Sequence, residues 1–198
     1  LSYFTEFWPS DNTDPIERLF IQWGFSQVFP AKTMCAHVTT WNKNSSVKFR
    51  TDVAMMCKLG FDIKLADMSK DDETYCRTAV QNYNRLKPVV LEGDMYRLVS
   101  PYGSNHTSTM YVGKDKDKAV VFAFDIHPRY AEKTLPVRLQ GLDADKMYRV
   151  KEINLMPGAN SSLSGNGEVF SGEFLMNVGL NLFTTQQLNS RVVEVVAE

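Results

Sequence analysis

FWPSDNTDPIERL, residues 7–19, places an aromatic run directly before two aspartates, a proline and a helical pattern. Asp14 stands where a helix N-cap is expected, because a carboxylate there accepts hydrogen bonds from the free N–H groups of the first turn. Pro15 follows at the first helical position, where its missing N–H costs nothing. Glu17, three residues after Asp14, completes a capping-box pattern. The stretch therefore predicts a strand, a turn and a helix.

Asp11 lies in the turn before this helix and has no comparable structural task. It follows the expected strand YFTEFW (3–8) directly. In α/β folds, turns at the carboxyl ends of strands are where binding and catalytic sites are built. A second turn aspartate before a helix is also common. The residue types alone therefore leave both a catalytic and a structural role open for Asp11.

The first 93 residues alternate between strand-like and helix-like patterns. In the first helix, Ile16, Leu19, Phe20 and Trp23 recur at helical spacing along one face. Units of about 30 residues are typical of βα repeats. Three such units are expected: strand 3–8 with helix 15–25, strand 34–41 with helix 50–59 ending at Gly60, and strand 61–66 with a long helix that Ser69 caps and Pro88 and Gly93 close.

The pattern changes after Gly93 to short runs rich in β-branched and aromatic residues, separated by turn clusters. The charged run KDKDK (114–118) predicts a solvated hairpin turn. Many short strands with regular turns are typical of an antiparallel sandwich. The expected strands cover residues 95–100, 107–113, 118–126, 135–141, 146–153, 172–178 and 191–198.

Together these patterns predict an α/β plus all-β chain. Residues 1–93 are expected to form the last three βα units of a (β/α)8 TIM barrel, because three units cannot close a barrel by themselves. Residues 94–198 are expected to form an antiparallel β-sandwich domain. The chain starts at Leu1 inside an apolar segment, and we expect it to be a piece of a longer protein.

The composition is that of an ordinary globular protein, with 43% apolar residues, 23% charged residues and a net charge of −1 over 198 residues. The sequence has no basic excess that would argue for a nucleic-acid partner and no long apolar run that would argue for a membrane span. Cys35, Cys57 and Cys76 are odd in number and widely spaced, which suggests neither a disulfide framework nor a zinc site. We therefore expect a reducing, cytoplasmic location and no metal.

FWPSDNTDPIERLFIQWGFSQVFP (7–30) resembles the signature of the family 36 glycoside hydrolases, the large bacterial α-galactosidases. The resemblance continues in family order through TMCAHVT (33–39), RTDVAMMCKLGFDIKL (50–65), GDMYRLVSP (93–101) and LQGLDADKMYRV (139–150). It implies a retaining enzyme that releases terminal α-linked galactose from oligosaccharides such as raffinose or melibiose. The resemblance further implies a homo-oligomer, often a tetramer, without metal or organic cofactor.

By this resemblance the general acid/base is Asp11, the first aspartate of the Ser-Asp-Asn-Thr-Asp motif. A retaining site needs a second carboxyl group about 5–5.5 Å away, and apolar surroundings such as Trp8 would help the acid to hold its proton. Trp8 is a candidate sugar platform or a core residue, and Ser10 and Asn12 are candidate substrate-binding residues. The family's nucleophile, an aspartate in a Lys-Trp-Asp-like motif, does not occur in this sequence, so we expect the chain alone to be inactive.

Two other functions are compatible with the residue types. The β-rich half would suit a noncatalytic carbohydrate-binding or interaction module. Cys35 and His37, two apart on an expected strand, would suit a thiol–imidazole hydrolase, although packed barrel residues often share this spacing. Arg18 and Arg50 are expected to pair with nearby acids on helix surfaces.

Overall fold

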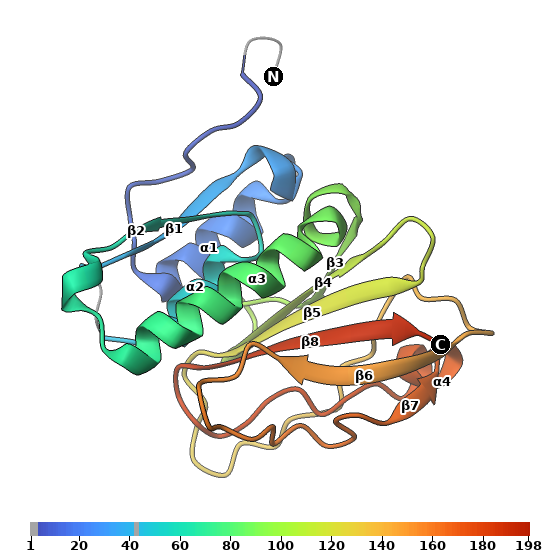
Figure 1. The fold of residues 1–198 in the computed structure, drawn as a ribbon. Helices are drawn as coiled ribbons and strands as arrows, with labels where there is room; N and C mark the ends of the chain where they lie inside the picture. Colours follow the sequence, from blue (N-terminus) through green and yellow to red (C-terminus); the bar gives the residue numbers. More distant parts are fainter. Residues whose placement is uncertain (1–3, 42–43) are drawn as a thin grey trace.

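The computed structural model describes residues 4–41 and 44–198 (Figure 1). The elements before residue 93 are α1 (Pro15–Phe25), η1 (Ala31–Thr33), β1 (Cys35–Thr39), α2 (Val47–Ala54), β2 (Lys58–Asp62), η2 (Leu65–Asp67) and α3 (Lys70–Glu92). β1 and β2 pair in parallel, and Phe7 adds a parallel bridge to Met34, the residue before β1. Three parallel segments therefore follow one another, each succeeded by a helix, as the βα pattern predicts.

Local hydrogen bonds explain where the first helix begins. The Asp14 Oδ1 atom accepts from the backbone N–H groups of Ile16 at 2.9 Å and Glu17 at 3.0 Å, which confirms the expected cap. The capping box is not completed, because the N–H of Asp14 donates instead to Asn12 Oδ1 at 2.9 Å. The Asp11 carboxyl group makes no hydrogen bond within the described part of the chain.

Several boundaries differ from those expected in this half. Within the described residues, the expected strand 3–8 is reduced to the single bridge at Phe7, and the expected strand 61–66 lies earlier, as β2. Gly60 does not end a helix: α2 is capped by Ser46, ends at Ala54, and leaves Gly60 inside β2 opposite His37. Pro88 does not end α3, which continues to Glu92. Val89 and Val90, directly after the proline, are buried, and their burial offsets the backbone hydrogen bond that a proline removes.

The second half forms one antiparallel sheet of six strands in the order β3-β4-β5-β8-β6-β7. The expected hairpin is confirmed, with the N–H of Gly113 donating to the Lys118 carbonyl at 2.8 Å around the exposed charged turn. The strands are β3 (Asp94–Val99), β4 (His106–Val112), β5 (Lys118–Asp125), β6 (Met147–Ile153), β7 (Val169–Ser171) and β8 (Asn189–Ala197).

Two stretches expected to be strands are not strands. Residues Gly172–Asn177 form the short helix α4, because the Ser171 hydroxyl caps it by accepting from the Phe174 N–H at 3.0 Å. The 135–141 stretch makes only an isolated bridge between Val137 and Leu180. Extended segments and α4 therefore form the layer that covers the outer face of the sheet.

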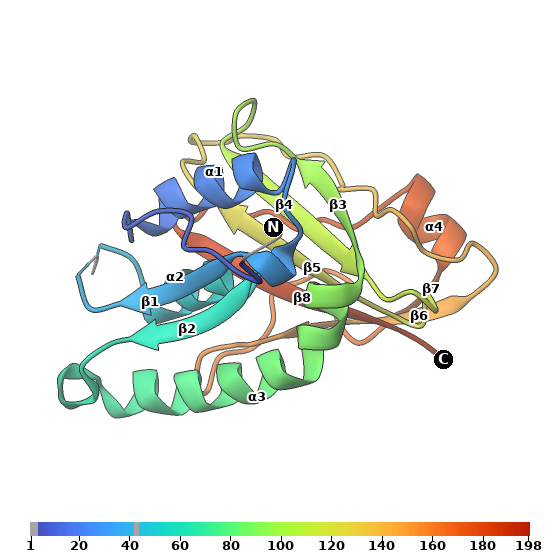
Figure 2. The same ribbon diagram turned by 90° about the horizontal axis from the view of Figure 1, so that it is seen from above.

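The six-stranded sheet is buried on both faces, with alternate residues entering different cores. On β5, Phe122 and Phe124 pack with the helices, whereas Val121 and Ala123 pack with the outer layer. Figure 1 shows α1, α2 and α3 between this sheet and the small parallel sheet, and Figure 2 shows β1 and β2 running between α1 and α3. The two halves of the chain therefore share one hydrophobic core. In the described ranges, no helix is both long and apolar enough to cross a bilayer.

A buried carboxylate on α2 links the helices to the six-stranded sheet. The Asp52 side chain is fully buried and forms an ion pair with Lys48 one turn earlier. Its Oδ1 accepts from the Tyr75 hydroxyl of α3 at 2.9 Å and from the Asn154 amide, which follows β6. Its Oδ2 accepts from the Ser190 hydroxyl of β8 at 2.7 Å. Every oxygen of this carboxylate is thus satisfied by groups from four segments.

We expect the substitution Asp52→Asn to lower the free energy of unfolding by roughly 3 kcal/mol, because it leaves the Lys48 ammonium group without its buried counter-ion. Urea unfolding followed by circular dichroism measures the change. The exposed turn residue Asp145, changed to asparagine, is the matched control and should be near neutral. A loss below about 1 kcal/mol would contradict a central role for this carboxylate.

The two aspartates of the opening turn should differ in their effect on stability. Asp14→Ala removes two hydrogen bonds to the first turn of α1 and should cost about 1 kcal/mol. Asp11→Ala removes none and should stay within about 0.5 kcal/mol of the wild type. Thermal unfolding of the two variants side by side measures the difference, and an equal cost for both would show that Asp11 has a structural task after all.

Candidate functional site

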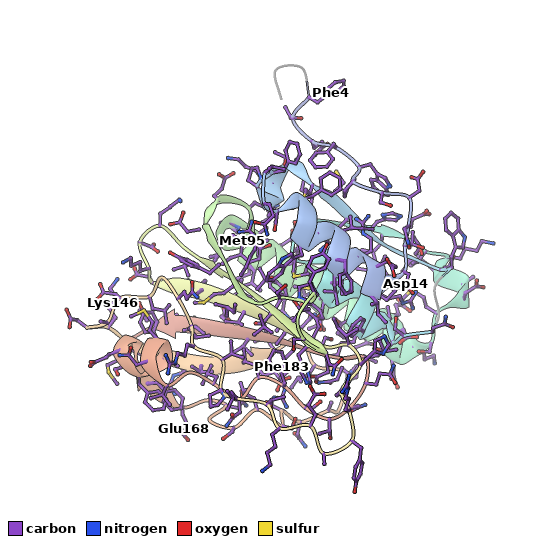
Figure 3. All side chains as sticks on the ribbon, turned by 180° about the vertical axis from the view of Figure 1, so that it is seen from behind. Phe4, Asp14, Met95, Lys146, Glu168 and Phe183 are labelled. Carbon is purple, nitrogen blue, oxygen red and sulfur yellow. The ribbon has the colours of Figure 1, made fainter. Side chains whose placement is uncertain are left out.

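The predicted site residues lie where the three parallel segments end. Trp8 and the turn follow the Phe7 bridge, Trp41 follows β1, and β2 ends at Asp62. The carboxyl ends of parallel strands meet at one edge of a sheet, and enzymes built on βα units place their chemistry there. In Figure 3, Asp14 marks the start of α1 at this edge.

Ser10 and Asn12 hold the turn through their side-chain oxygens. The Ser10 Oγ atom accepts from the N–H of Asn12 at 3.0 Å, and Asn12 Oδ1 accepts from the N–H of Asp14 at 2.9 Å. The Ser10 hydroxyl hydrogen and the Asn12 amide hydrogens make no further bond within the described residues. Both side chains therefore shape the loop and keep donors that a ligand can use.

Asp11 is exposed, and its charge acts on His37 in β1. Burial lowers the pKa of His37 and the charge of Arg18 adds to this effect, whereas Asp62 and Asp11 oppose it. The carboxylates of Asp11, from the first parallel segment, and Asp62, from the third, thus both act on the imidazole of His37 in the second. The described residues bring Asp11, Asp62 and His37 to one edge but leave the Asp11 carboxyl open to solvent.

Trp8 packs on His37 rather than enclosing Asp11. The two ring centroids are 4.0 Å apart with the planes tilted by 38°. Trp8 remains 48% exposed, so it is not a core residue in this structure. One side of the indole is therefore engaged by the imidazole while much of the ring stays open, as a stacking platform requires.

Two arginines support this edge in a way that the residue pattern did not predict. Arg18 is buried rather than on a helix surface, and its guanidinium donates to the carbonyls of Ser10 at 2.9 Å and Cys35 at 3.1 Å. Arg50 likewise donates to the carbonyl of Thr39. Arg18 thus ties the turn that carries Asp11 to the neighbouring strand. The only sequence feature that could have indicated this contact is the position of Arg18, one helical turn after Asp14.

The thiol–imidazole alternative lacks an activated thiol. Burial and the charge of Glu6 raise the pKa of Cys35, although Lys58 partly opposes this effect. A nucleophilic cysteine needs a lowered thiol pKa. His37 Nδ1 has no hydrogen-bond partner among the described residues, so no third group orients the ring. Packing in the parallel sheet is the better interpretation of the Cys35 and His37 spacing.

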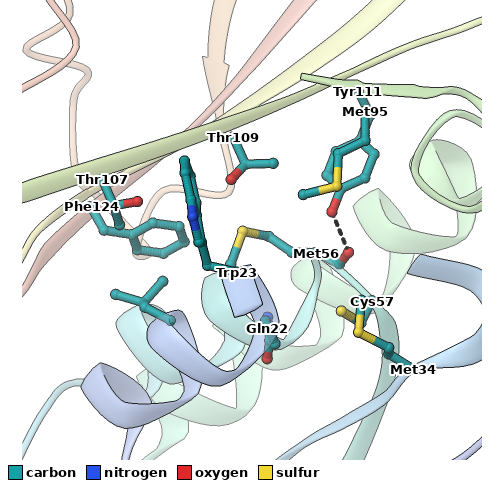
Figure 4. Close-up of a pocket in the computed structure, with 11 residues that line it drawn as sticks. Gln22, Trp23, Met34, Met56, Cys57, Met95, Thr107, Thr109, Tyr111 and Phe124 are labelled. Atoms are coloured by element: carbon teal, nitrogen blue, oxygen red, sulfur yellow. Dashed lines mark hydrogen bonds between the residues drawn. The ribbon is translucent and has the colours of Figure 1, made fainter. Parts of the chain in front are cut away.

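The described residues build no metal site at this edge, and the cavities next to Arg18 and His37 and beside α1 are small. They contain no group of three His, Cys, Asp or Glu side chains that could hold a metal ion, and their cysteines are free. The cavity beside Arg18 and His37 has a volume of about 10 Å³. The cavity in Figure 4, between α1 and the six-stranded sheet, is equally small and includes Gln22 and Tyr111. Each has room for about one water molecule.

Comparisons with known proteins identify the family of the chain. The family model described as Melibiase matches residues 1–93, and the glycosyl hydrolase family 36 C-terminal domain matches residues 106–195. The chain is 35% identical over 199 residues to alpha-galactosidase 2 of Hypocrea jecorina and 30% identical over 182 residues to alpha-galactosidase 1 of Pediococcus pentosaceus. These alignments cover 98% and 89% of the chain, but 25% and 23% of the relatives.

Solved structures agree over nearly the whole chain. The GH36 alpha-galactosidase AgaB from Geobacillus stearothermophilus has a TM-score of 0.86 and 28% identity, over 99% of this chain and 26% of that one. An AgaA variant from the same organism, in complex with raffinose, has a TM-score of 0.82 and 27% identity, over 96% of this chain and 25% of that one. The chain thus spans about a quarter of the length of these relatives. It belongs to glycosyl hydrolase family 36 and combines the end of the family's catalytic barrel with its C-terminal β domain.

Proposed function

We propose that this chain supplies the general acid/base of a retaining α-galactosidase, and that Asp11 is the acid/base residue. The observation that carries the proposal is the free Asp11 carboxyl at the edge where three parallel segments end. Its neighbours Ser10 and Asn12 hold the turn, and Asp14 caps the helix, so Asp11 alone has no structural partner within the described residues. A carboxyl group without a structural partner is free to exchange a proton with substrate.

In the proposed mechanism, Asp11 gives its proton to the glycosidic oxygen while a second carboxylate attacks the anomeric carbon. The resulting glycosyl–enzyme ester is then hydrolysed, with the Asp11 carboxylate taking a proton from water. The second carboxylate and the apolar enclosure that an acid needs belong, in this proposal, to the remaining three quarters of a family-sized protein. The 198-residue chain by itself therefore lacks turnover.

Arg18 supports this role by positioning the Asp11 turn. Its guanidinium holds the Ser10 carbonyl, one residue before Asp11, against β1. Small displacements of a catalytic group lower reaction rates steeply. The buried guanidinium fixes the backbone next to the acid and so favours proton transfer. Trp8, half exposed beside this turn, is placed to pack against an apolar face of galactose.

The proposed substrates are α-galactoside oligosaccharides such as raffinose or melibiose. Solved relatives are named as complexes with raffinose and stachyose, which supports this substrate class. We extend the proposal to a homo-oligomeric, cytoplasmic enzyme; the free cysteines in the described residues fit a reducing compartment. A noncatalytic carbohydrate-binding module is the second candidate, and a cavity of about 620 Å³ on the β-rich half favours it.

Replacing Asp11 by alanine in the full-length protein separates the two candidates. Loss of a general acid should lower kcat/KM for raffinose by about 10²–10⁴-fold. Nitrophenyl α-galactoside, whose leaving group needs little protonation, should lose less in its first step, and added azide should partly restore turnover by attacking the glycosyl–enzyme. Steady-state kinetics and product analysis measure these effects.

Asp67→Ala, at an exposed carboxylate in η2, is the matched control and should retain turnover. Hydrolysis of raffinose by the Asp11→Ala protein at the wild-type rate would refute the acid/base role. A drop in sugar affinity with unchanged turnover number would instead favour the binding module.

A further inference from the structure

The cavity on the β-rich half is large enough for a sugar ligand. Its volume of about 620 Å³ lies within the usual range of small-molecule sites. It is lined by β3, the start of β4, the 132–140 segment and the end of α4, and shares no lining residue with the 8–14 turn. Phe183 and Leu98 contribute to an apolar wall, while His106, Glu132 and Arg138 contribute polar groups. Figure 3 marks the position of Phe183 on this half of the molecule.

A buried histidine is fixed in one orientation at this cavity. His106 is only 3% exposed, and its Nδ1 lies 2.8 Å from Asp125 Oδ1. The Asp125 carboxylate also accepts from the Thr184 hydroxyl at 2.6 Å and the Asn189 amide at 2.9 Å. A carboxylate accepts but does not donate, so Nδ1 carries a proton, and Nε2 is the ring nitrogen left for another partner. Phe183 stacks on the ring at a centroid distance of 4.6 Å.

The other ring nitrogen of His106 has no partner among the described residues. Its Nε2 atom is buried and makes no hydrogen bond within the described residues. Glu132 Oε1 is 3.8 Å away, beyond hydrogen-bond distance. The Arg129 N–H donates to Glu132 at 2.7 Å and, more than any other group, lowers the pKa of its carboxyl. The Asn105 amide also donates to Glu132 Oε1 at 3.2 Å, so His106 Nε2 is the buried atom that still needs a hydrogen-bond partner, which a ligand in the cavity can supply.

The residues that line the cavity restrict the chemistry of a ligand that could bind there. An anion would be repelled by the Glu132 carboxylate, whereas a cation would meet Lys133 and Arg138 in the same lining. The described residues offer no third His, Cys, Asp or Glu that would complete a metal site here. A neutral hydroxyl can form a hydrogen bond with Nε2 and accept from a nearby cation. The apolar wall then suits the C–H face of a sugar ring.

We propose that this cavity is a second carbohydrate site, in which a sugar hydroxyl donates to His106 Nε2 or Glu132. The choice of an α-galactoside as its occupant rests on the proposed function, whereas the hydroxyl chemistry rests on the cavity alone. This site binds an oligosaccharide at a second position, apart from the proposed catalytic edge around Asp11.

Isothermal titration of the full-length protein with raffinose tests this site. Asp11→Asn serves as the background, so that the sugar stays intact during the titration. We expect two binding events per chain, and Glu132→Gln should weaken one of them at least tenfold and leave the other unchanged. Glutamine keeps the oxygen that accepts from the Arg129 N–H, so the loop is retained. Glu168→Gln, at an exposed carboxylate of another loop, is the matched control.

A crystal of the same protein soaked in raffinose should show the sugar beside His106. One binding event per chain, a second event that Glu132→Gln leaves unchanged, or a lone water at Nε2 would each overturn the proposal. Leu135→Ala, which shortens an exposed apolar side chain of the lining, should also weaken the second event. Turnover of raffinose by the protein that retains Asp11, compared with turnover by the Asp11→Asn background, reports the proposed function separately from this site.

Discussion

One buried carboxylate, that of Asp52, joins the βα half of the chain to its β-rich half. It accepts from α3, from the residue after β6 and from β8, and pairs with Lys48 on its own helix. A buried charge is tolerated only where all its lone pairs are satisfied, so the network fixes how the helices sit on the sheet. The hydrophobic core around it, with Phe49 against Phe124, is less directional and supplies the larger apolar burial.

This junction matters for the proposed catalytic edge, where the three parallel segments end, because α1 and α2 provide the groups that hold it. Arg18 of α1 and Arg50 of α2 both donate to backbone carbonyls at or beside β1. The turn that carries Asp11 is therefore supported from the same helices that pack on the six-stranded sheet. Arg18 is buried and Arg50 is half-buried, and carbonyl acceptors hold both charges in place, which sequence patterns do not reveal.

The two proposed sugar-binding regions follow different physical rules. At the catalytic edge, Ser10 and Asn12 use their oxygens for the loop, and the Asp11 carboxyl is left free to exchange a proton. In the β-rich half, Asp125 orients His106 so that its buried Nε2 is left without a partner among the described residues. The first arrangement suits chemistry on a bond, whereas the second suits recognition of a hydroxyl group without reaction.

The sequence by itself determined the features that depend on near neighbours: the caps at Asp14 and Ser69, the hairpin around residues 114–118, the change from βα units to strands, and the family signature around Asp11. These features arise from hydrogen bonds and periodicities within a few residues, which any local reading can detect. Only the tertiary structure decided that Gly60 lies in a strand, that α3 passes through Pro88, and that Arg18 is buried. The reason is that burial depends on which distant segment covers a residue, and that information is spread over the whole chain.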